Sequence, residues 1–212
     1  MKVFRNIYLR QDGQLAILVN YKCGFATLHN ALVLNRTDSD FAYADAPEQD
    51  VKAASQAVLF VRDPAARLRS FFRNWIIDKA YGTDDKQHGY EFSKNWLTAR
   101  DYAKLTAASG DEKNTAAFIE FYINRIGPAF WTDQHTAPQW RLLQNHNLDL
   151  SDLSAVLNYR ENTTFLRDHC GLDVAVRNVS LSSGPDPLDC PAVTAFCKTL
   201  YARDYDMFGD QF

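Results

Sequence analysis

The chain has 212 residues, of which 46% are hydrophobic and 23% are charged, and its net charge at pH 7 is −3. This composition is that of an ordinary globular protein and excludes a disordered chain. The small negative charge argues against bulk capture of nucleic acid or of an anionic membrane, so any anion site must be local.

The first half of the chain alternates between strand and helix patterns. Residues 14–22 (QLAILVNYK) are an apolar run that ends in a polar turn, which predicts a strand buried on both faces. Residues 25–34 have helical spacing, and residues 35–50, rich in Asp, Ala and Pro, are expected to form a loop. Residues 57–61 (AVLFV) predict a second strand, and Pro64 suits the first turn of the helix that follows.

The second half adds further helices and a third strand. Gly127-Pro128 is expected to end a helix, and Gly171 suits a helix C-terminus. The alternation favours an α/β fold in which helices flank a central parallel sheet, as a single domain over residues 1–212. The remaining elements are expected as helices at 92–108, 113–126 and 162–171, an irregular segment at 131–140, a strand within 153–161, and a last helix from Pro191.

The cysteines and histidines show no metal-ligand spacing. Four cysteines form no C-x-x-C pair, and five histidines form no H-x-x-H pair. No apolar run reaches the length of a membrane helix, and the first residues lack the apolar core of a signal peptide. We therefore expect reduced thiols, no metal, no transmembrane segment and a cytoplasmic protein.

The segment NYKCGFATL, residues 20–28, has the features of an anion-binding turn. Gly24 can adopt a positive φ, the backbone N–H groups that follow are unsatisfied within the helix, and the helix dipole favours negative charge. Lys22 adds a positive charge and Thr27 a hydroxyl donor. The nucleoside-triphosphate pattern G-x-x-x-x-G-K-[ST] is absent. The alternative is an ordinary strand–turn–helix with a surface lysine.

A second candidate anion site lies in AVLFVRDPAARLRSFF, residues 57–72. Arg62 follows a buried strand, at the sheet edge where α/β proteins bind ligands, and Ser70 lies two helical turns further on. A guanidinium and a hydroxyl together suit a phosphate. In the alternative interpretation, Asp63 caps the helix and the arginines pair with acidic neighbours. Two such turns on one sheet suggest a ligand with two separated phosphate groups.

Five segments resemble motifs of PAPS-dependent sulfotransferases, in the order of that family and from about residue 17 to 209. The first candidate turn is similar to the 5′-phosphosulfate loop P-K-x-G-x-T-S/T-[LIF]. The second is similar to the 3′-phosphate motif R-D-P-x-x-R-x-x-S-x-x-R-N of the branch with the Golgi carbohydrate sulfotransferases and their bacterial relatives. WTDQHTAPQW resembles D-x-H-W-x-P-Q of that branch, NYRENT resembles its F/Y-E-N-L segment, and LYARDYDMFG resembles its L-Y-x-x-D-Y-x-x-F-G.

The resemblance implies the nucleotide-kinase-like sulfotransferase fold and transfer of a sulfuryl group from 3′-phosphoadenosine 5′-phosphosulfate (PAPS) to a hydroxyl, expected on a carbohydrate. Arg62 and Ser70 would bind the 3′-phosphate. Lys22 would stabilise the leaving phosphate, and His135, flanked by Asp133, would act as general base. The 5′-phosphosulfate would be bound by Lys22, Cys23, Gly24, Phe25, Ala26, Thr27 and Leu28.

The chain departs from the family patterns at three positions. Tyr21 replaces a proline, Ala26 a threonine and Thr136 a tryptophan, so one hydroxyl contact to the 5′-phosphate is missing. These departures motivate the alternative of a PAP- or polysaccharide-binding module that has lost turnover. A small-molecule kinase is a further alternative, disfavoured by the missing G-K-[ST]. If His135 is not the base, Glu161 and His29 are the next candidates.

Overall fold

The structure, a computed structural model, describes residues 6–34, 40–44, 48–72, 112–159, 163–171 and 188–212. Its contacts divide the chain into two compact units. The sheet unit comprises residues up to Asp63, Pro138–Leu181 and Arg203–Phe212, and the helical unit comprises Pro64–Ala137 and Ser182–Ala202. The single domain over residues 1–212 stays a prediction.

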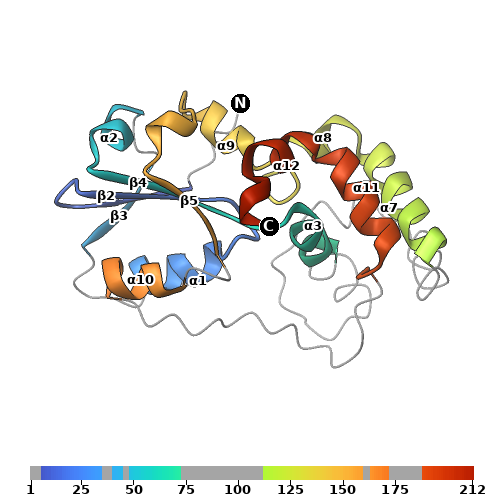
Figure 1. The fold of residues 1–212 in the computed structure, drawn as a ribbon, viewed down its shortest axis with the longest axis horizontal. Helices are drawn as coiled ribbons and strands as arrows, with labels where there is room; N and C mark the ends of the chain where they lie inside the picture. Colours follow the sequence, from blue (N-terminus) through green and yellow to red (C-terminus); the bar gives the residue numbers. More distant parts are fainter. Residues whose placement is uncertain (1–5, 35–39, 45–47, 73–111, 160–162, 172–187) are drawn as a thin grey trace. The chain divides into compact units, whose positions relative to one another are not determined.

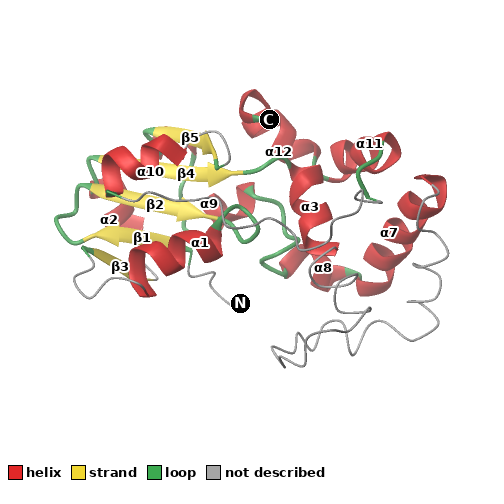
Figure 2. Cartoon of the chain, turned by 90° about the horizontal axis from the view of Figure 1, so that it is seen from below, coloured by secondary structure: helices red, strands yellow, loops and turns green. Residues whose placement is uncertain are grey.

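A five-stranded mixed sheet forms the centre of the sheet unit, with the strand order β3-β1-β2-β4-β5 (Figures 1 and 2). The strands β2, β4 and β5 are parallel, whereas β1 runs antiparallel to β2 and β3. The predicted α/β class is therefore confirmed, and the predicted parallel sheet is right for three strands and wrong for β1 and β3. The strands are β1 (Ile7–Arg10), β2 (Leu15–Val19), β3 (Phe41–Ala44), β4 (Gln56–Val61) and β5 (Ala155–Asn158).

A tight turn explains the antiparallel pairing of β1 with β2. Asp12-Gly13 is a typical hairpin dipeptide, Gly13 has a φ of 69°, and its N–H donates to the Arg10 carbonyl at 2.8 Å. The Asp12 carboxylate accepts hydrogen bonds from the Arg10 side chain and the Gln14 N–H. The Arg10 guanidinium holds the pKa of Asp12 below its ordinary value.

The predicted loop over residues 35–50 is wrong for β3 and for the first residues of the helix α2 (Glu48–Ala53). β3 pairs with β1 and buries Phe41, and α2 buries Val51. Both elements are short, with four residues in β3 and six in α2, so their sequences give too little periodicity to detect. Residues 35–39 and 45–47 lie outside the described residues.

Helices cover both faces of the sheet (Figure 1). On one face lie α1 (Phe25–His29), its π-helical continuation (Asn30–Leu34) and α10 (Thr163–Cys170). On the other lie α2, α9 (Trp140–Asn145) and the end of α12 (Ala202–Phe208). Short 3₁₀ turns follow at Leu150–Asp152 and Gly209–Gln211.

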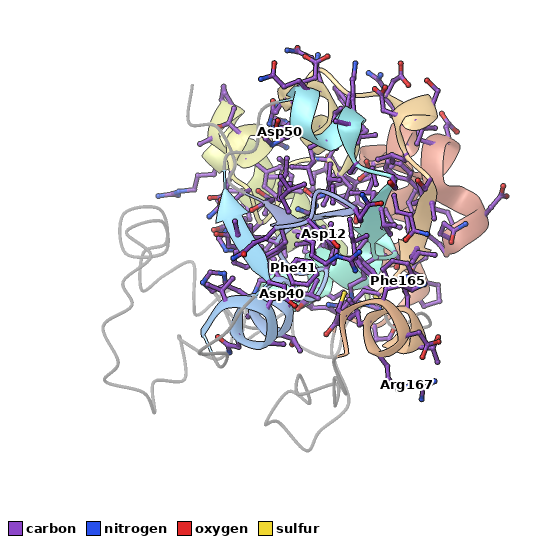
Figure 3. The ribbon with its side chains drawn as sticks, turned by 90° about the vertical axis from the view of Figure 1, so that its left-hand side faces the viewer. Asp12, Asp40, Phe41, Asp50, Phe165 and Arg167 are labelled. Atoms are coloured by element: carbon purple, nitrogen blue, oxygen red, sulfur yellow. The ribbon has the colours of Figure 1, made fainter. Side chains whose placement is uncertain are left out.

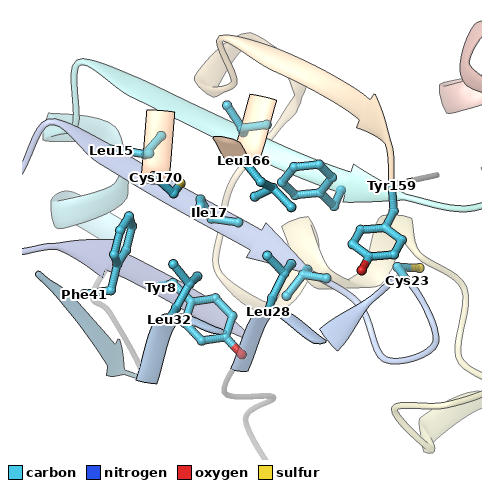
Figure 4. Packing of buried hydrophobic residues seen from close by; sticks show 13 residues of the cluster. Tyr8, Leu15, Ile17, Cys23, Leu28, Leu32, Phe41, Tyr159, Leu166 and Cys170 are labelled. Carbon is cyan, nitrogen blue, oxygen red and sulfur yellow. The ribbon is translucent and has the colours of Figure 1, made fainter. Parts of the chain in front are cut away.

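Strand β2 is buried on both faces, as its sequence predicts. Ile17 packs with side chains of α1 and α10 (Figure 4). Leu18 packs with side chains of α9 on the opposite face. In Figure 3, Phe41 and Phe165 lie on the α1 and α10 side of the sheet, and Asp50 lies on the α2 side. The apolar layers hold the carboxyl ends of the strands in fixed register.

The helical unit has no strand among its described residues (Figure 2). Helices α3 and α7 both pack against α11. Gly127, with a φ of 60°, ends α7 before Pro128 starts α8, as predicted, and the single predicted C-terminal helix breaks at Tyr201. Residues 92–108 lie outside the described residues. The helices are α3 (Pro64–Phe72), α7 (Glu112–Ile126), α8 (Pro128–Thr132) and α11 (Pro191–Leu200).

Within the described ranges, no helix combines the length and the apolar character that crossing a bilayer requires.

Candidate anion-binding site

The carboxyl ends of the three parallel strands lie at one edge of the sheet. Val19 of β2 pairs with Phe60 of β4, and Val61 pairs with Asn158 of β5. The segments that follow these strands are the turn at residues 20–24, Arg62 and Tyr159. The predicted phosphosulfate turn and Arg62 are therefore brought to the same edge, where α/β sheets bind ligands.

The turn after β2 has the backbone conformation that Gly24 predicts, and one further strained residue. Gly24 has a φ of 91° and precedes α1, and the Cys23 N–H donates to the Asn20 carbonyl at 3.1 Å. Lys22 also has a positive φ, 67°, although it is not glycine. Such a conformation costs on the order of 1 kcal/mol and persists only where neighbouring contacts enforce it.

The side chain of Arg62 reaches the backbone of this turn. Its Nη1 donates a hydrogen bond to the Lys22 carbonyl oxygen at 3.1 Å. The guanidinium of the second candidate motif thus contacts the first candidate motif directly. Arg62 and Lys22 are both half-buried.

Gln139 is fully buried and forms hydrogen bonds with residues of both motifs. Its Oε1 accepts the Arg62 N–H at 3.0 Å and the Cys23 thiol at 3.1 Å, and its Nε2 donates to the Arg62 carbonyl at 2.9 Å. Its own carbonyl accepts from Asn20 Nδ2 at 3.2 Å. Sequence reasoning missed Gln139; the only signal was its place as the last residue of the segment that resembles D-x-H-W-x-P-Q.

A buried carboxylate fixes the backbone of Gln139. Asp204 is fully buried, and its two oxygens accept the N–H groups of Gln139 at 2.9 Å and Trp140 at 3.0 Å. These N–H groups start α9, where a carboxylate is favourable. Next to it, the Tyr205 hydroxyl donates to Asp63 at 3.0 Å. The segment LYARDYDMFG therefore meets both WTDQHTAPQW and the start of the Arg62 motif.

Tyr159 brings the remaining segment, NYRENT, into contact with the turn at residues 20–24. Its ring lies so close to Gly24 that a Cβ there would be 2.2 Å from a ring carbon. Burial raises the pKa of Tyr159, and a contact with the Thr27 side chain opposes that change. Residues from all five segments thus meet around one edge of the sheet, an arrangement that the individual motifs did not predict.

The other two arginines of the second motif have structural contacts within the helical unit. Arg67 is 2% exposed and donates to the Ala137 carbonyl at 2.7 Å and the Gln134 carbonyl at 3.0 Å. Arg69 forms an ion pair with Asp189, as the alternative interpretation expects. Ser70 is half-buried in α3. Because Ser70 belongs to the helical unit and Arg62 to the sheet unit, their joint role stays a prediction.

The His135 side chain contacts the carboxylate of Asp133, the residue that flanks it in the third segment. Both side chains are almost fully buried, His135 Nδ1 lies 3.0 Å from Asp133 Oδ1, and the same oxygen accepts the His135 N–H. The neighbouring Thr136 hydroxyl donates to the Phe130 carbonyl at 2.6 Å, so this buried polar group has a hydrogen-bond partner. The role of His135 as a base stays a prediction. Glu161 lies outside the described residues.

The fold and site define an α/β protein with a candidate anion-binding edge built from a glycine turn, an arginine and a buried glutamine. We compared the chain with protein-family models, with curated proteins and with solved structures, and none of the three comparisons found a match. The assignment below therefore depends on the motifs and on the contacts among them.

Proposed function

We propose that the protein is a PAPS-dependent sulfotransferase that transfers a sulfuryl group to a hydroxyl of a carbohydrate. The observation that supports this proposal most is the meeting of residues from five segments at one edge of the sheet, although these residues range from Asn20 to Tyr205 in the sequence. Each of them resembles a motif of one family. The proposal includes the nucleotide-kinase-like sulfotransferase fold in a single domain and a cytoplasmic location.

The two phosphate groups of the cofactor differ in their proposed partners. The turn at residues 22–28 binds the 5′-phosphosulfate, and Arg62 with Ser70 binds the 3′-phosphate. The bond from Arg62 Nη1 to the Lys22 carbonyl, 3.1 Å, supports this pairing because it keeps the guanidinium beside the turn. A forked guanidinium recognises a phosphate better than a point charge does, which favours PAPS over a nucleotide without a 3′-phosphate.

The chemical step is an in-line transfer. The acceptor oxygen forms a bond to sulfur, the bond between sulfur and the 5′-phosphate oxygen breaks, and PAP leaves. Lys22 stabilises the negative charge that develops on the leaving phosphate. His135 removes the acceptor proton with Nε2, because the contact of Nδ1 with Asp133 at 3.0 Å favours the tautomer with its proton on Nδ1.

A transfer assay tests this function against the second candidate. Ala26 provides no hydroxyl to a phosphate, which favours a PAP-binding module without turnover as the alternative. The protein is incubated with ³⁵S-labelled PAPS and a panel of oligosaccharides, and labelled sugar is measured. Transfer by the wild-type protein and its loss in Lys22→Ala support the enzyme. Binding of PAP without transfer to any acceptor supports the module.

The general base is tested in the same assay under single-turnover conditions. His135→Ala is expected to lower the rate by roughly 10²–10⁴-fold while PAP affinity stays nearly unchanged. A normal rate and pH profile in this variant would reassign the base to Glu161 or His29.

A further inference from the structure

We infer that Gln139 is a positioning residue that fixes the phosphosulfate turn and Arg62 relative to each other. The ligand named in this inference rests on the proposed function, whereas the contacts themselves do not. Gln139 touches neither proposed phosphate in this scheme; it acts through the backbone of residues that do.

The amide of Gln139 is suited to this role because it carries an acceptor and a donor on one plane. Oε1 accepts the Arg62 N–H at 3.0 Å and Nε2 donates to the Arg62 carbonyl at 2.9 Å, so the side chain pairs with Arg62 as a neighbouring strand would. Glutamate lacks the donor, and asparagine is shorter by one methylene group. The residue is 0% exposed, so a lost bond leaves a buried polar group unpaired, which is costly.

The same residue holds the turn on both sides of its strained lysine. The Gln139 carbonyl accepts from Asn20 Nδ2 at 3.2 Å, and Oε1 accepts the Cys23 thiol at 3.1 Å. Lys22, with its φ of 67°, lies between these two anchors. The bond from Arg62 Nη1 to the Lys22 carbonyl then closes a cycle of contacts through Gln139, Arg62 and the turn.

This closed cycle of contacts fixes the position of the phosphosulfate turn relative to Arg62. A ligand with two phosphate groups gains from it, because both partners are already at the correct separation. A ligand with one phosphate needs only one element in place. Loss of Gln139 should therefore weaken the binding of a diphosphorylated nucleoside more than that of a monophosphorylated one.

The test compares Gln139→Met, which keeps the length of the side chain, with Gln144→Met at an exposed position in α9, the helix that begins directly after Gln139. The exchange rate of the Arg62 amide hydrogen measures, without any ligand, how firmly Gln139 holds Arg62. We expect the Arg62 amide to exchange at least about tenfold faster in Gln139→Met and unchanged in Gln144→Met, because only the first variant removes its acceptor. If Gln139→Met does not fold, Gln139→Leu serves as the second variant, because it also removes the acceptor of the Arg62 N–H.

Affinities for PAP and for AMP, which lacks the 3′-phosphate, are measured on the same proteins. We expect PAP affinity to fall at least about tenfold in Gln139→Met and AMP affinity to fall less than about threefold, because only PAP uses both elements. Equal losses for the two ligands, or an unchanged Arg62 exchange rate, would overturn the positioning role. A wild-type protein that binds neither nucleotide would instead overturn the proposed function, while the exchange experiment would still decide whether Gln139 fixes Arg62.

Discussion

The Arg62 guanidinium donates a hydrogen bond to the carbonyl oxygen of Lys22, at 3.1 Å, across two parallel strands and 40 residues of sequence. The contact joins a positively charged side chain to the turn that carries a second one. Two positively charged residues are thus in contact at a sheet edge, an arrangement that a bound anion would stabilise.

Arg62→Ala and Arg62→Lys are expected to weaken PAP binding by roughly ten- to a hundredfold, because a lost charge-assisted bond to a phosphate costs about 1.5–3 kcal/mol. Lysine does not restore the affinity, since it lacks the forked geometry. The measurement is isothermal titration calorimetry with PAP. Arg167→Ala, at an exposed position in α10, is the control and should bind as the wild type does. Normal affinity in both Arg62 variants would leave Arg62 with a structural role only.

Gly24→Ala is expected to destabilise the protein by about 3 kcal/mol, because alanine is strained at a positive φ and its Cβ meets the buried Tyr159 ring. Gly13→Ala separates the two causes. Gly13 has a φ of 69° but no atom near the position of a Cβ, so its substitution should cost only about 1 kcal/mol. Urea unfolding measures both losses.

The clash has its own test in a double variant. Combined with Tyr159→Leu, the cost of Gly24→Ala should shrink by at least about 1 kcal/mol, because the ring is gone. Additive losses would show that the ring does not oppose a side chain at position 24.

Asp204→Ala is expected to cost about 2–4 kcal/mol, because it leaves the N–H groups of Gln139 and Trp140 buried without their acceptor. Asp206→Ala lies on the same helix, is exposed, and should change the free energy of unfolding by less than about 0.5 kcal/mol. Equal effects in chemical denaturation would mean that Asp204 is not the cap of α9.

The raised pKa of Tyr159 predicts that the wild-type protein and a Tyr159→Phe variant respond differently to alkaline pH. Its folded pKa is raised by burial above the ordinary value near 10, so the neutral phenol favours the folded state. This contribution is complete below about pH 10 and is lost as the pH rises towards the folded pKa, by up to about 1.4 kcal/mol per pH unit.

Tyr159→Phe cannot ionise and should therefore lose less stability than the wild type between about pH 9 and pH 11. The measurement is urea unfolding of the two proteins across this range. Taking the difference between their free energies of unfolding removes the contribution of the other titrating groups. Parallel pH profiles would place the Tyr159 hydroxyl in solvent-like surroundings.

The elements that could be predicted from sequence are those with strong local signals. Apolar runs found β2 and β4, Pro64 marked the start of α3, and Gly24 marked a positive φ. β1 and β3 were missed because each is only four residues long. Their pairing comes from the Asp12-Gly13 hairpin and from neighbours elsewhere in the sheet.

The candidate site was predictable only in part, for a different physical reason. Lys22 and Arg62 carry chemistry in their residue types, so a local pattern identifies them. Gln139 and Asp204 matter through contacts across 77 and 65 residues, and no local pattern encodes such partners. The alternative interpretation pairs the arginines with acidic neighbours, yet Arg67 is buried and donates to two backbone carbonyls.

The most direct test of the account is the thermal shift caused by PAP compared with ATP. Recognition of a 3′-phosphate beside the Lys22 turn predicts that PAP at about 100 times its Kd stabilises the folded protein by roughly 2.7 kcal/mol. For a chain of this length the melting temperature should rise by about 5–10 °C, while ATP at the same concentration leaves it unchanged. Equal shifts with the two nucleotides, or none with PAP, would contradict the assignment of this site to PAPS.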